Sequence, residues 1–213
     1  MADTGEEHNK HKDFLKGKLS GDRSVHPMKM FSKWYQEAIE KDCADPHAVV
    51  LSTATMDGKP SSRIVYMREL VEEGFIVYTN YKSRKGNEII ENPHVSLLFY
   101  WDCCERQVRI EGLVEIVDPI LSDDYFAARP RISQIGAWAS DQSSEIVDRE
   151  ELEARVSHFE KKFPNEVPRP PHWGGFIIKP EYIEFWQGRL GRLHDRICYQ
   201  KHGDDWSAFR LSP

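Results

Sequence analysis

Basic residues follow a predicted helix start at Ser83. Ser83 is a typical N-cap residue, so Arg84 and Lys85 fall in the first turn of a helix predicted over residues 83–91. Positive charge at that end opposes the helix dipole, at a cost of about 0.3–1 kcal/mol per charge. The conflict disappears if an anion is bound there by the free N–H groups and both side chains. The pattern predicts a phosphate site, with a solvated basic turn as the alternative.

Two arginines flank an apolar run within a predicted strand. An odd number of positions separates Arg63 from Arg68, so a regular strand would turn them to opposite sides. Contacts to ligands on both sides of the strand are one interpretation. Surface charges on an edge strand are the other.

A third group lies at a predicted helix end. Tyr125 and Arg129 are at i and i+4, so they share one face of the helix predicted over residues 119–129. Pro130 ends that helix and Ser133 follows closely. Two hydroxyls and a guanidinium converging there would suit a phosphate monoester. A capped helix end with a surface arginine would explain the same residues.

The densest group of ligand-type side chains lies between Trp186 and Arg196. Arg192, His194 and Arg196 share strand parity, so they are predicted to face one side of the sheet. A lone histidine is more often structural than catalytic, but the neighbouring arginines favour a pocket. Together the groups predict two separated anion sites, as one phosphorylated cofactor and one phosphorylated substrate would need.

The usual catalytic signatures are absent. The sequence has no GxGxxG, P-loop, GxSxG or HExxH segment, and its nine histidines lack metal-ligand spacing. We therefore expect no metal site, and we expect an enzyme with this sequence to rely on a bound organic cofactor.

Charge and cysteine usage limit the class of protein. Lys and Arg number 29 against 35 Asp and Glu, a net charge of −6, which argues against nucleic-acid binding. The N-terminal segment has no apolar signal region, and no membrane-spanning run is present, so a cytoplasmic protein is expected. Cys43, Cys103, Cys104 and Cys198 show neither zinc nor disulfide spacing and are predicted to be reduced thiols.

The elements that position these residues form an α+β pattern. Alternating and β-branched runs predict strands, and the Asp57-Gly58 pair predicts a hairpin turn. The predicted strands are residues 47–56, 61–70, 74–80, 93–101, 106–117, 173–178, 182–186, 196–200 and 206–211. The predicted helices are residues 27–41, 83–91, 119–129 and a helix capped by Asp148 that carries Leu152, Val156, Phe159 and Phe163.

The length of 213 residues suits one domain with an extension. Residues 1–25 are charged and poor in apolar side chains, which predicts a mobile N-terminal arm or lid. Residues 26–213 are predicted to form a single domain, an antiparallel β-barrel with peripheral helices.

Nine segments of this sequence closely resemble the pyridoxamine/pyridoxine 5′-phosphate oxidase family. The combination of RLHDR, SQIGAW and EFWQG is highly specific, and the resemblance covers residues 27–213 in order. The segments are RIVYMR (63–68), YTNYKSRKG (78–86), LLFYW (97–101), ERQVRIEG (105–112), YFAARPRISQIGAWAS (125–140), DQSS (141–144), WGGF (173–176), EFWQG (184–188) and RLHDR (192–196).

The resemblance implies a fold, a cofactor and a set of contacts. The implied fold is an FMN-binding split β-barrel, antiparallel and Greek-key-like, acting as a homodimer with two FMN sites at the subunit interface. The implied FMN contacts are Arg63, Ile64, Val65, Tyr66, Met67, Arg68, Tyr78, Thr79, Ser83, Arg84, Lys85, Gln107, Gln142, Ser143, Trp186 and Arg196. The implied substrate contacts are Arg68, Tyr125, Arg129 and Ser133 at the phosphate, and Arg192 and His194 as the catalytic pair at the pyridine ring.

The resemblance also implies a reaction. Pyridoxine 5′-phosphate or pyridoxamine 5′-phosphate would be oxidised to pyridoxal 5′-phosphate while dioxygen is reduced to hydrogen peroxide. A split-barrel reductase with another electron donor and a flavin or pyridoxal-phosphate carrier are the alternatives. RLHDR and SQIGAW argue against the reductase, and turnover would exclude the carrier.

Two departures from the family pattern bear on substrate binding. Arg68 stands where the family usually has lysine, and its longer, forked head is expected to hold phosphate differently. The lid segment reads His11-Lys12-Asp13-Phe14 in place of an Arg-Arg-Glu-Tyr-like run, so Phe14 lacks the hydroxyl. Weaker closure over the substrate is therefore expected.

Overall fold

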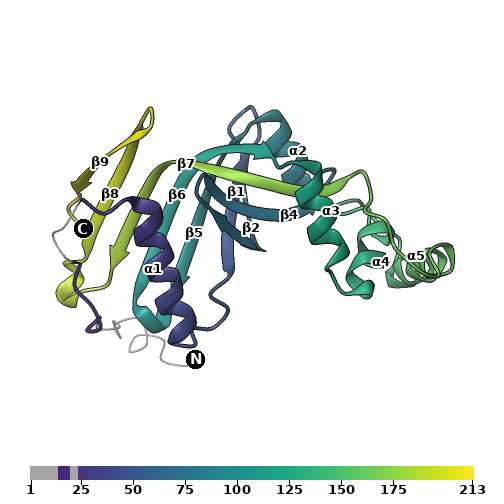
Figure 1. Cartoon of the computed structure of the whole chain (residues 1–213), viewed down its shortest axis with the longest axis horizontal. Helices are drawn as coiled ribbons and strands as arrows, with labels where there is room; N and C mark the ends of the chain where they lie inside the picture. The colour runs from purple at the N-terminus through teal and green to yellow at the C-terminus, as the bar shows by residue number, and fades with distance from the viewer. Residues whose placement is uncertain (1–13, 20–23) are drawn as a thin grey trace, which may run out of the picture. The chain divides into compact units, whose positions relative to one another are not determined.

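The computed structural model describes residues 14–19 and 24–213 (Figure 1). Residues 1–13 and 20–23, which make up most of the predicted arm and include His11, lie outside the described residues. The helices are α1 (Pro27–Glu40), α2 (Arg84–Glu91), α3 (Pro119–Ala127), α4 (Arg131–Ala139) and α5 (Arg149–Lys162), with short 3₁₀ turns η1 (Asp102–Cys104) and η2 (Leu190–Arg192). The strands are β1 (Ala48–Ala54), β2 (Pro60–Tyr66), β3 (Glu69–Val71), β4 (Gly74–Asn80), β5 (His94–Trp101), β6 (Arg106–Ile116), β7 (Trp173–Gln187), β8 (Asp195–His202) and β9 (Asp205–Arg210).

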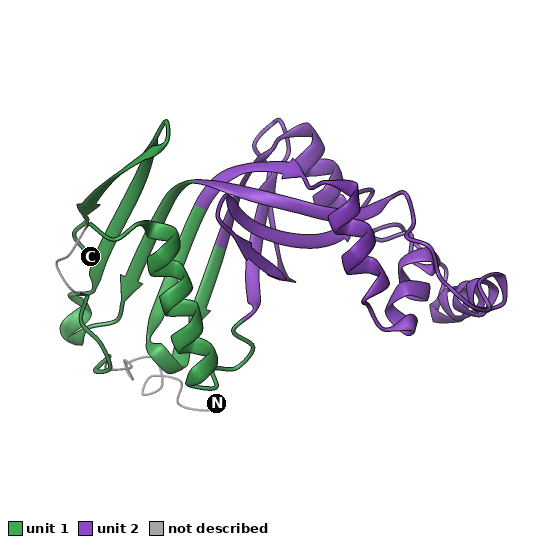
Figure 2. Ribbon diagram, in the orientation of Figure 1, with its two compact units in different colours: residues 1–46, 98–110, 181–213 green, residues 47–97, 111–180 purple. Residues whose placement is uncertain are grey.

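The strands form one hydrogen-bonded sheet, which confirms the predicted α+β class. Its order is β2-β1-β5-β6-β7-β4-β3, with β8 paired to β7 and β9 paired to β8. The pairs β1–β2, β3–β4, β4–β7, β7–β8 and β8–β9 are all antiparallel. The chain divides into two compact units, one of residues 1–46, 98–110 and 181–213, the other of residues 47–97 and 111–180 (Figure 2). The prediction of a single domain over residues 26–213 remains a prediction.

The second unit, residues 47–97 and 111–180, begins with the predicted hairpin. Gly58 adopts a φ of +80°, which a side chain would strain, and its N–H donates to Thr55 O at 2.9 Å. This turn sets the β1–β2 register, in which Leu51 pairs with Arg63. Buried side chains alternate along β1 and leave the β2 residues opposite them partly or fully exposed.

Helices α3, α4 and α5 of the second unit pack around a small apolar core. Phe126, Ile135, Val167 and Trp173 are buried there, and Phe159 of α5 packs against them. The predicted cap of α5 is confirmed, because the Asp148 side chain accepts from Glu151 N at 2.8 Å. These contacts fix the ends of α3 and α4, from which several site residues project.

The first unit, residues 1–46, 98–110 and 181–213, is built on helix α1. Phe31, Trp34 and Ala38 form its buried face, as the helical spacing predicts. Phe31 meets Phe99 of β5 edge-on at 5.0 Å, and Trp34 meets Phe185 of β7 at 5.1 Å. This aromatic core supports the last residues of β7 and their pairing with β8.

Two sequence predictions about the elements are wrong, and one helix was missed. Residues 61–70 form two strands, because the chain leaves β2 at Tyr66 and resumes at Glu69. Residues 173–187 form one continuous strand although Pro180 interrupts its hydrogen bonding, since the flanking residues pair with β4 and β8. Helix α4 was not predicted; it begins directly after Pro130, which stands at its N-cap position with an extended ψ of 138°.

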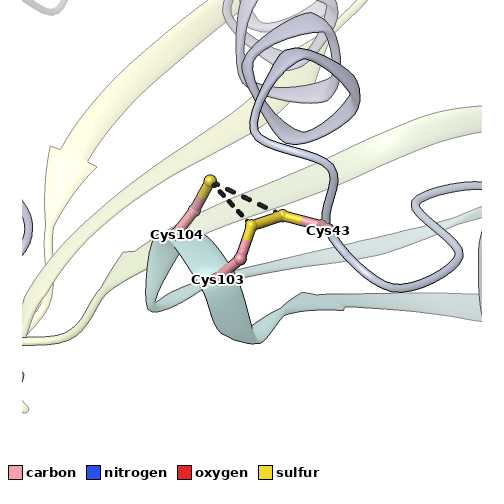
Figure 3. Close-up of side chains that lie close together, drawn as sticks. All are labelled: Cys43, Cys103 and Cys104. Carbon is pink, nitrogen blue, oxygen red and sulfur yellow. Dashed lines mark hydrogen bonds between the residues drawn. A yellow bond between two sulfur atoms is a disulfide. The ribbon is translucent and has the colours of Figure 1, made fainter.

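The cysteine prediction is also wrong. Cys43, in the loop after α1, and Cys103, in η1, form a disulfide with their Cα atoms 5.4 Å apart (Figure 3). Cys104 and Cys198 are free thiols and both are buried. The pairing joins residues 60 positions apart, so only the packing of α1 on the sheet brings them together. Within the described residues, no helix is long and apolar enough to cross a membrane.

Candidate functional site

A pocket of about 550 Å³ lies within the second unit, in the size range of small-molecule sites. Its walls carry four cationic side chains together with tyrosine and tryptophan rings. It is lined by Arg63, Ile64, Val65, Tyr66, Arg68, Tyr78, Thr79, Asn80, Lys85, Tyr125, Arg129, Ser133, Gly136, Ala137, Ser140, Gln142 and Trp173. The four cations and the aromatic rings suit an aromatic ligand that carries phosphate.

The start of helix α2 lies at this pocket, and Lys85 is its residue that lines it. Ser83 is fully buried and caps the helix by accepting from Gly86 N at 3.3 Å. Lys85 reaches back over this end, where its Nζ donates to Ser83 Oγ at 3.2 Å and to Gln142 Oε1 at 2.9 Å. Burial, and then the charge of Arg63, lower the pKa of Lys85 to about 8. An anion bound at this helix end would relieve both effects.

Arg63 is held in place by a buried network. Its Nη1 donates to Thr53 Oγ1 at 2.6 Å and to Leu51 O at 3.2 Å. Its Nη2 lies 3.4 Å from the carboxylate of Glu88, on helix α2. These contacts orient the guanidinium, and the Arg63 side chain, which lines the pocket, is 23% exposed.

Glu88 does not line the pocket but pairs with Arg63, which does, and the sequence analysis missed this supporting role. Its side chain is only 6% exposed, and it also pairs with Arg84 at 2.8 Å and accepts from Ser61 Oγ at 2.8 Å. Burial alone would raise the pKa of Glu88, but hydrogen bonds from Thr53, Arg84 and Ser61 outweigh it and lower the pKa to about 2. The i,i+4 spacing from Arg84 was the available signal. Glu88 therefore stays ionised and balances the cations around it.

Three aromatic rings stack along another wall of the pocket. Tyr78 and Tyr125 are parallel with centroids 3.9 Å apart, and Trp173 lies 5.6 Å from Tyr78 at an interplanar angle of 8°. Tyr78 donates its hydroxyl to Glu69 at 2.7 Å, and burial followed by this carboxylate raises the pKa of Tyr78. Tyr78 is therefore protonated at neutral pH and positions its ring rather than a charge.

Arg129 follows the C-terminus of α3 and carries an unsatisfied donor. Its guanidinium lies 4.6 Å from the Trp173 ring, a cation–π contact. Its Nη1 is buried and has no hydrogen-bond partner among the described residues. Burial lowers the pKa of Arg129, Tyr125 opposes this, and Arg68 adds to it. A buried donor without a partner is costly, so this atom marks where an anionic ligand oxygen would bind.

The predicted opposite orientations of Arg63 and Arg68 are wrong. The strand ends between them, so the alternation no longer applies and both side chains line the same pocket. Arg68 donates its backbone N–H to Ile76 O at 2.9 Å, and its guanidinium lies over the Tyr66 ring at 4.7 Å.

Some predicted contacts in this unit do not line the pocket. Met67 is 2% exposed and belongs to the core, and Ser143 is exposed with a φ of +73°. Ser83 is buried and accepts a hydrogen bond from Lys85, and Arg84 forms an ion pair with Glu88. The pocket adds lining residues that carried no predicted role, although the matching segments contained them. They are Asn80, Gly136, Ala137, Ser140 and Trp173.

A second cluster of predicted residues lies in the first unit. Trp186 of β7 and His194 have ring centroids 4.6 Å apart, and Phe14 meets them edge-on at 5.5 Å and 5.6 Å. His194 Nδ1 accepts from Arg189 N at 3.1 Å, which leaves Nε2 available to a ligand. Burial, and then the charge of Arg192, lower the pKa of His194, so the ring is neutral at pH 7.

The prediction that Arg192, His194 and Arg196 lie on one strand and face one side of the sheet is wrong. Strand β8 begins only at Asp195, and Arg192 ends η2 with a φ of +61°. Arg196 pairs with Trp186 across the strands and binds both oxygens of buried Glu184, at 2.9 and 3.0 Å. Gln107 lies partly buried on β6 of the same unit.

The strand order and the cationic, ring-lined pocket define an α+β split-barrel protein suited to phosphorylated aromatic ligands. A profile of the pyridoxamine 5′-phosphate oxidase family matches residues 35–163, and a profile of the pyridoxine 5′-phosphate oxidase C-terminal dimerisation region matches residues 173–213. The chain belongs to the pyridoxamine 5′-phosphate oxidase family.

Relatives cover nearly the whole chain. A pyridoxine/pyridoxamine 5′-phosphate oxidase of Rubrobacter xylanophilus is 52% identical over 88% of this chain and 87% of its own length. One from Actinobacillus pleuropneumoniae is 48% identical over 97% and 99%. The crystal structure of PhzG from Burkholderia lata, in complex with tetrahydrophenazine-1-carboxylic acid, is similar at a TM-score of 0.87 and 32% identity. It covers 92% of this chain and 98% of that one. An FMN-binding protein of Nostoc punctiforme shares the fold at a TM-score of 0.72 and 15% identity.

Proposed function

We propose that this protein oxidises pyridoxine 5′-phosphate or pyridoxamine 5′-phosphate to pyridoxal 5′-phosphate, with FMN as its cofactor and dioxygen as the electron acceptor. The observation that carries the proposal is the buried Nη1 of Arg129, which no described residue engages, in a pocket that also holds Arg63, Arg68 and Lys85. Four cations in one pocket exceed the need of one phosphate. They suit the phosphate of a cofactor and that of a substrate.

The residues present fit FMN. Lys85, Arg63 and the capped start of α2 would hold its phosphate, because they combine free N–H groups with two cations. Thr79 and Gln142, joined at 3.4 Å, supply hydroxyl and amide groups for the rest of the cofactor. The resemblance adds Gln107, Trp186 and Arg196. When bound, FMN would accept a hydride from the C4′ carbon of the substrate and pass the electrons to dioxygen.

The substrate phosphate would be held by Arg129, Arg68, Tyr125 and Ser133. Arg129 supplies a donor that has no partner within residues 14–19 and 24–213, and the stacked rings of Tyr78 and Tyr125 form this wall of the pocket. Phosphate contacts exist in the ground state and the transition state alike, so they set affinity and orientation rather than the chemical step.

Arg192 and His194 would act at the pyridine ring. The neutral His194 can donate one hydrogen bond from Nε2, because its Nδ1 accepts from the backbone N–H of Arg189 and the ring proton is therefore on Nε2. Arg192 carries a fixed charge beside it and would orient the ring. We assign no general base to this pair.

We also propose that the chain acts as a homodimer with FMN at the subunit interface. The match of residues 173–213 to the family's dimerisation region supports the dimer. A cytoplasmic location remains a prediction.

The test is the visible spectrum of the purified protein, mixed anaerobically with pyridoxine 5′-phosphate and then exposed to air. We expect a flavin band that bleaches and then returns with hydrogen peroxide and pyridoxal 5′-phosphate. A flavin band that neither phosphorylated substrate bleaches would favour a reductase with another donor or a carrier. Bleaching by a tricyclic carboxylate alone would favour a PhzG-like substrate. A protein that does not bind FMN would refute the cofactor assignment.

A further inference from the structure

Three cysteine sulfurs converge in the first unit, and none of these cysteines is assigned a role in the reaction. Cys43 and Cys103 form the disulfide, and the free Cys104 Sγ lies 3.8 Å from Cys43 Sγ and 3.5 Å from Cys103 Sγ (Figure 3). All three ligand atoms lie within 4.8 Å of one another. A free thiol this close to both atoms of a disulfide can exchange with it.

The three cysteines differ in their access to solvent. Cys43 and Cys104 are 5% and 2% exposed, whereas Cys103 is partly exposed. A small oxidant therefore reaches Cys103 first. Cys104 can attack Cys43 Sγ, which forms a buried Cys43–Cys104 disulfide and releases Cys103 as a thiolate on the accessible side.

The turn that carries Cys103 and Cys104 is tied by hydrogen bonds to the Trp186–His194 cluster. Gln187 Nε2 donates to Cys104 O at 3.2 Å, and Gly188 N donates to Glu105 O at 2.8 Å. These residues directly follow Trp186 and lead into η2.

The same turn also anchors the N-terminal segment of residues 14–19. Lys16 Nζ donates to Cys103 O at 3.1 Å, and Lys16 N donates to the Glu105 carboxylate at 2.8 Å. Phe14, two residues earlier, packs on Trp186 and His194. The Cys43–Cys103 disulfide, which joins η1 to the loop after α1, therefore also fixes the position of the groups on Cys103 and Glu105 that hold residues 14–19.

We propose that Cys43, Cys103 and Cys104 form a peroxide-oxidised thiol site that controls how firmly residues 14–19 cover Trp186 and His194. The Cys103 thiolate attacks hydrogen peroxide and becomes a sulfenic acid, releasing hydroxide, which takes up a proton to give water. The Cys43 thiol then attacks that sulfur, forming the disulfide and releasing a second water. Two thiols are oxidised and one peroxide is reduced. The proposal rests on the proposed function only for the source of the peroxide.

The test starts from the full-length protein, reduced with a phosphine and freed of it. One sample receives hydrogen peroxide directly, and another generates it by turnover with pyridoxine 5′-phosphate. Alkylation and peptide mass spectrometry then locate the linked cysteines. We expect Cys43–Cys103 and some Cys43–Cys104 linkage, and only Cys43–Cys103 in Cys104→Ser. The matched control is Cys198→Ser. Cys198 is a buried cysteine of the same unit, but its Sγ accepts a hydrogen bond from the Tyr182 hydroxyl at 2.9 Å and is not part of the three-cysteine cluster.

Hydrogen exchange of a peptide covering residues 14–19 reads out the consequence. Reduction should speed its exchange in the wild type and in Cys198→Ser, but not in Cys43→Ser, which lacks the bond in either state. The proposal would be overturned if all the thiols could still be alkylated after treatment with hydrogen peroxide. It would also be overturned if hydrogen exchange of residues 14–19 were the same in the oxidised and reduced protein. Uptake of one zinc ion that protects all three thiols from peroxide would overturn it as well. If added hydrogen peroxide forms the disulfide but the protein does not turn over pyridoxine 5′-phosphate, the proposed reaction fails and this inference stands.

Discussion

Replacing Arg129 by leucine should weaken binding of the phosphorylated substrate and spare the chemical step. In the wild type, the buried Nη1 has no partner among the described residues, and the guanidinium rests on Trp173 at 4.6 Å. Leucine keeps an apolar contact with this ring and removes the donor. The loss is therefore confined to the contact with the ligand anion.

The magnitude follows from the cost of one charge-assisted hydrogen bond, about 1.5–3 kcal/mol. At about 1.4 kcal/mol per tenfold, KM should rise roughly 10- to 150-fold. The value of kcat should change by less than about twofold, because the phosphate is held equally in the ground and transition states.

The assay compares pyridoxine 5′-phosphate with unphosphorylated pyridoxine in both proteins. In the wild type, removing the phosphate should cost affinity, and in Arg129→Leu that cost should shrink by the factor lost in KM. Arg149→Leu is the control, since this side chain of the same unit is 80% exposed. The reasoning is refuted if both substrates lose equally, or if kcat falls while KM is unchanged.

Three further predictions concern the residues around the pocket and the Trp186–His194 cluster. FMN affinity should fall as pH rises above about 8, because Lys85 is then neutral and must take up a proton to bind phosphate. Fluorescence titration at several pH values measures the affinity, and Lys85→Arg should abolish its dependence on pH. Glu88→Gln should lower the free energy of unfolding by about 1–3 kcal/mol at pH 7. The ion pair with Arg84 adds little to this value, because the Arg84 side chain is 63% exposed and solvent screens its charge. Because the folded pKa of Glu88 lies near 2, below its ordinary 4.5, that difference should vanish as pH falls from about 5 to 2 in denaturant titrations. Phe14→Tyr should lower KM by adding a hydroxyl beside His194; unchanged KM and kcat would count against a lid role.

Local patterns determined much of the fold and part of the site. The Ser83 cap, the Asp57-Gly58 turn and the Asp148 cap each depend on residues within a few positions, so the sequence predicts them and the structure confirms them. The segment resemblance likewise identified most of the residues that line the pocket. Cationic residues beside a helix start are informative because the dipole makes them unfavourable without an anion.

Strand parity failed wherever the chain left the sheet. Arg63 and Arg68 line one pocket because the strand breaks between them, and Arg192 lies in η2 rather than on β8. Alternation is valid only while consecutive residues stay in extended conformation, and a sequence pattern does not show a break of one or two residues.

Tertiary packing alone decided the remaining features. The sequence by itself determined most of the helices and strands, though not α4 or the break between β2 and β3, and it showed which cations could bind anions, since those features depend on local backbone preferences and charge. It could not show that Glu88 is buried among Arg63, Thr53 and Ser61, or that Cys43 reaches Cys103 across 60 positions. Both depend on distant segments meeting in a close-packed interior, where burial sets pKa values and brings reactive atoms within bonding distance.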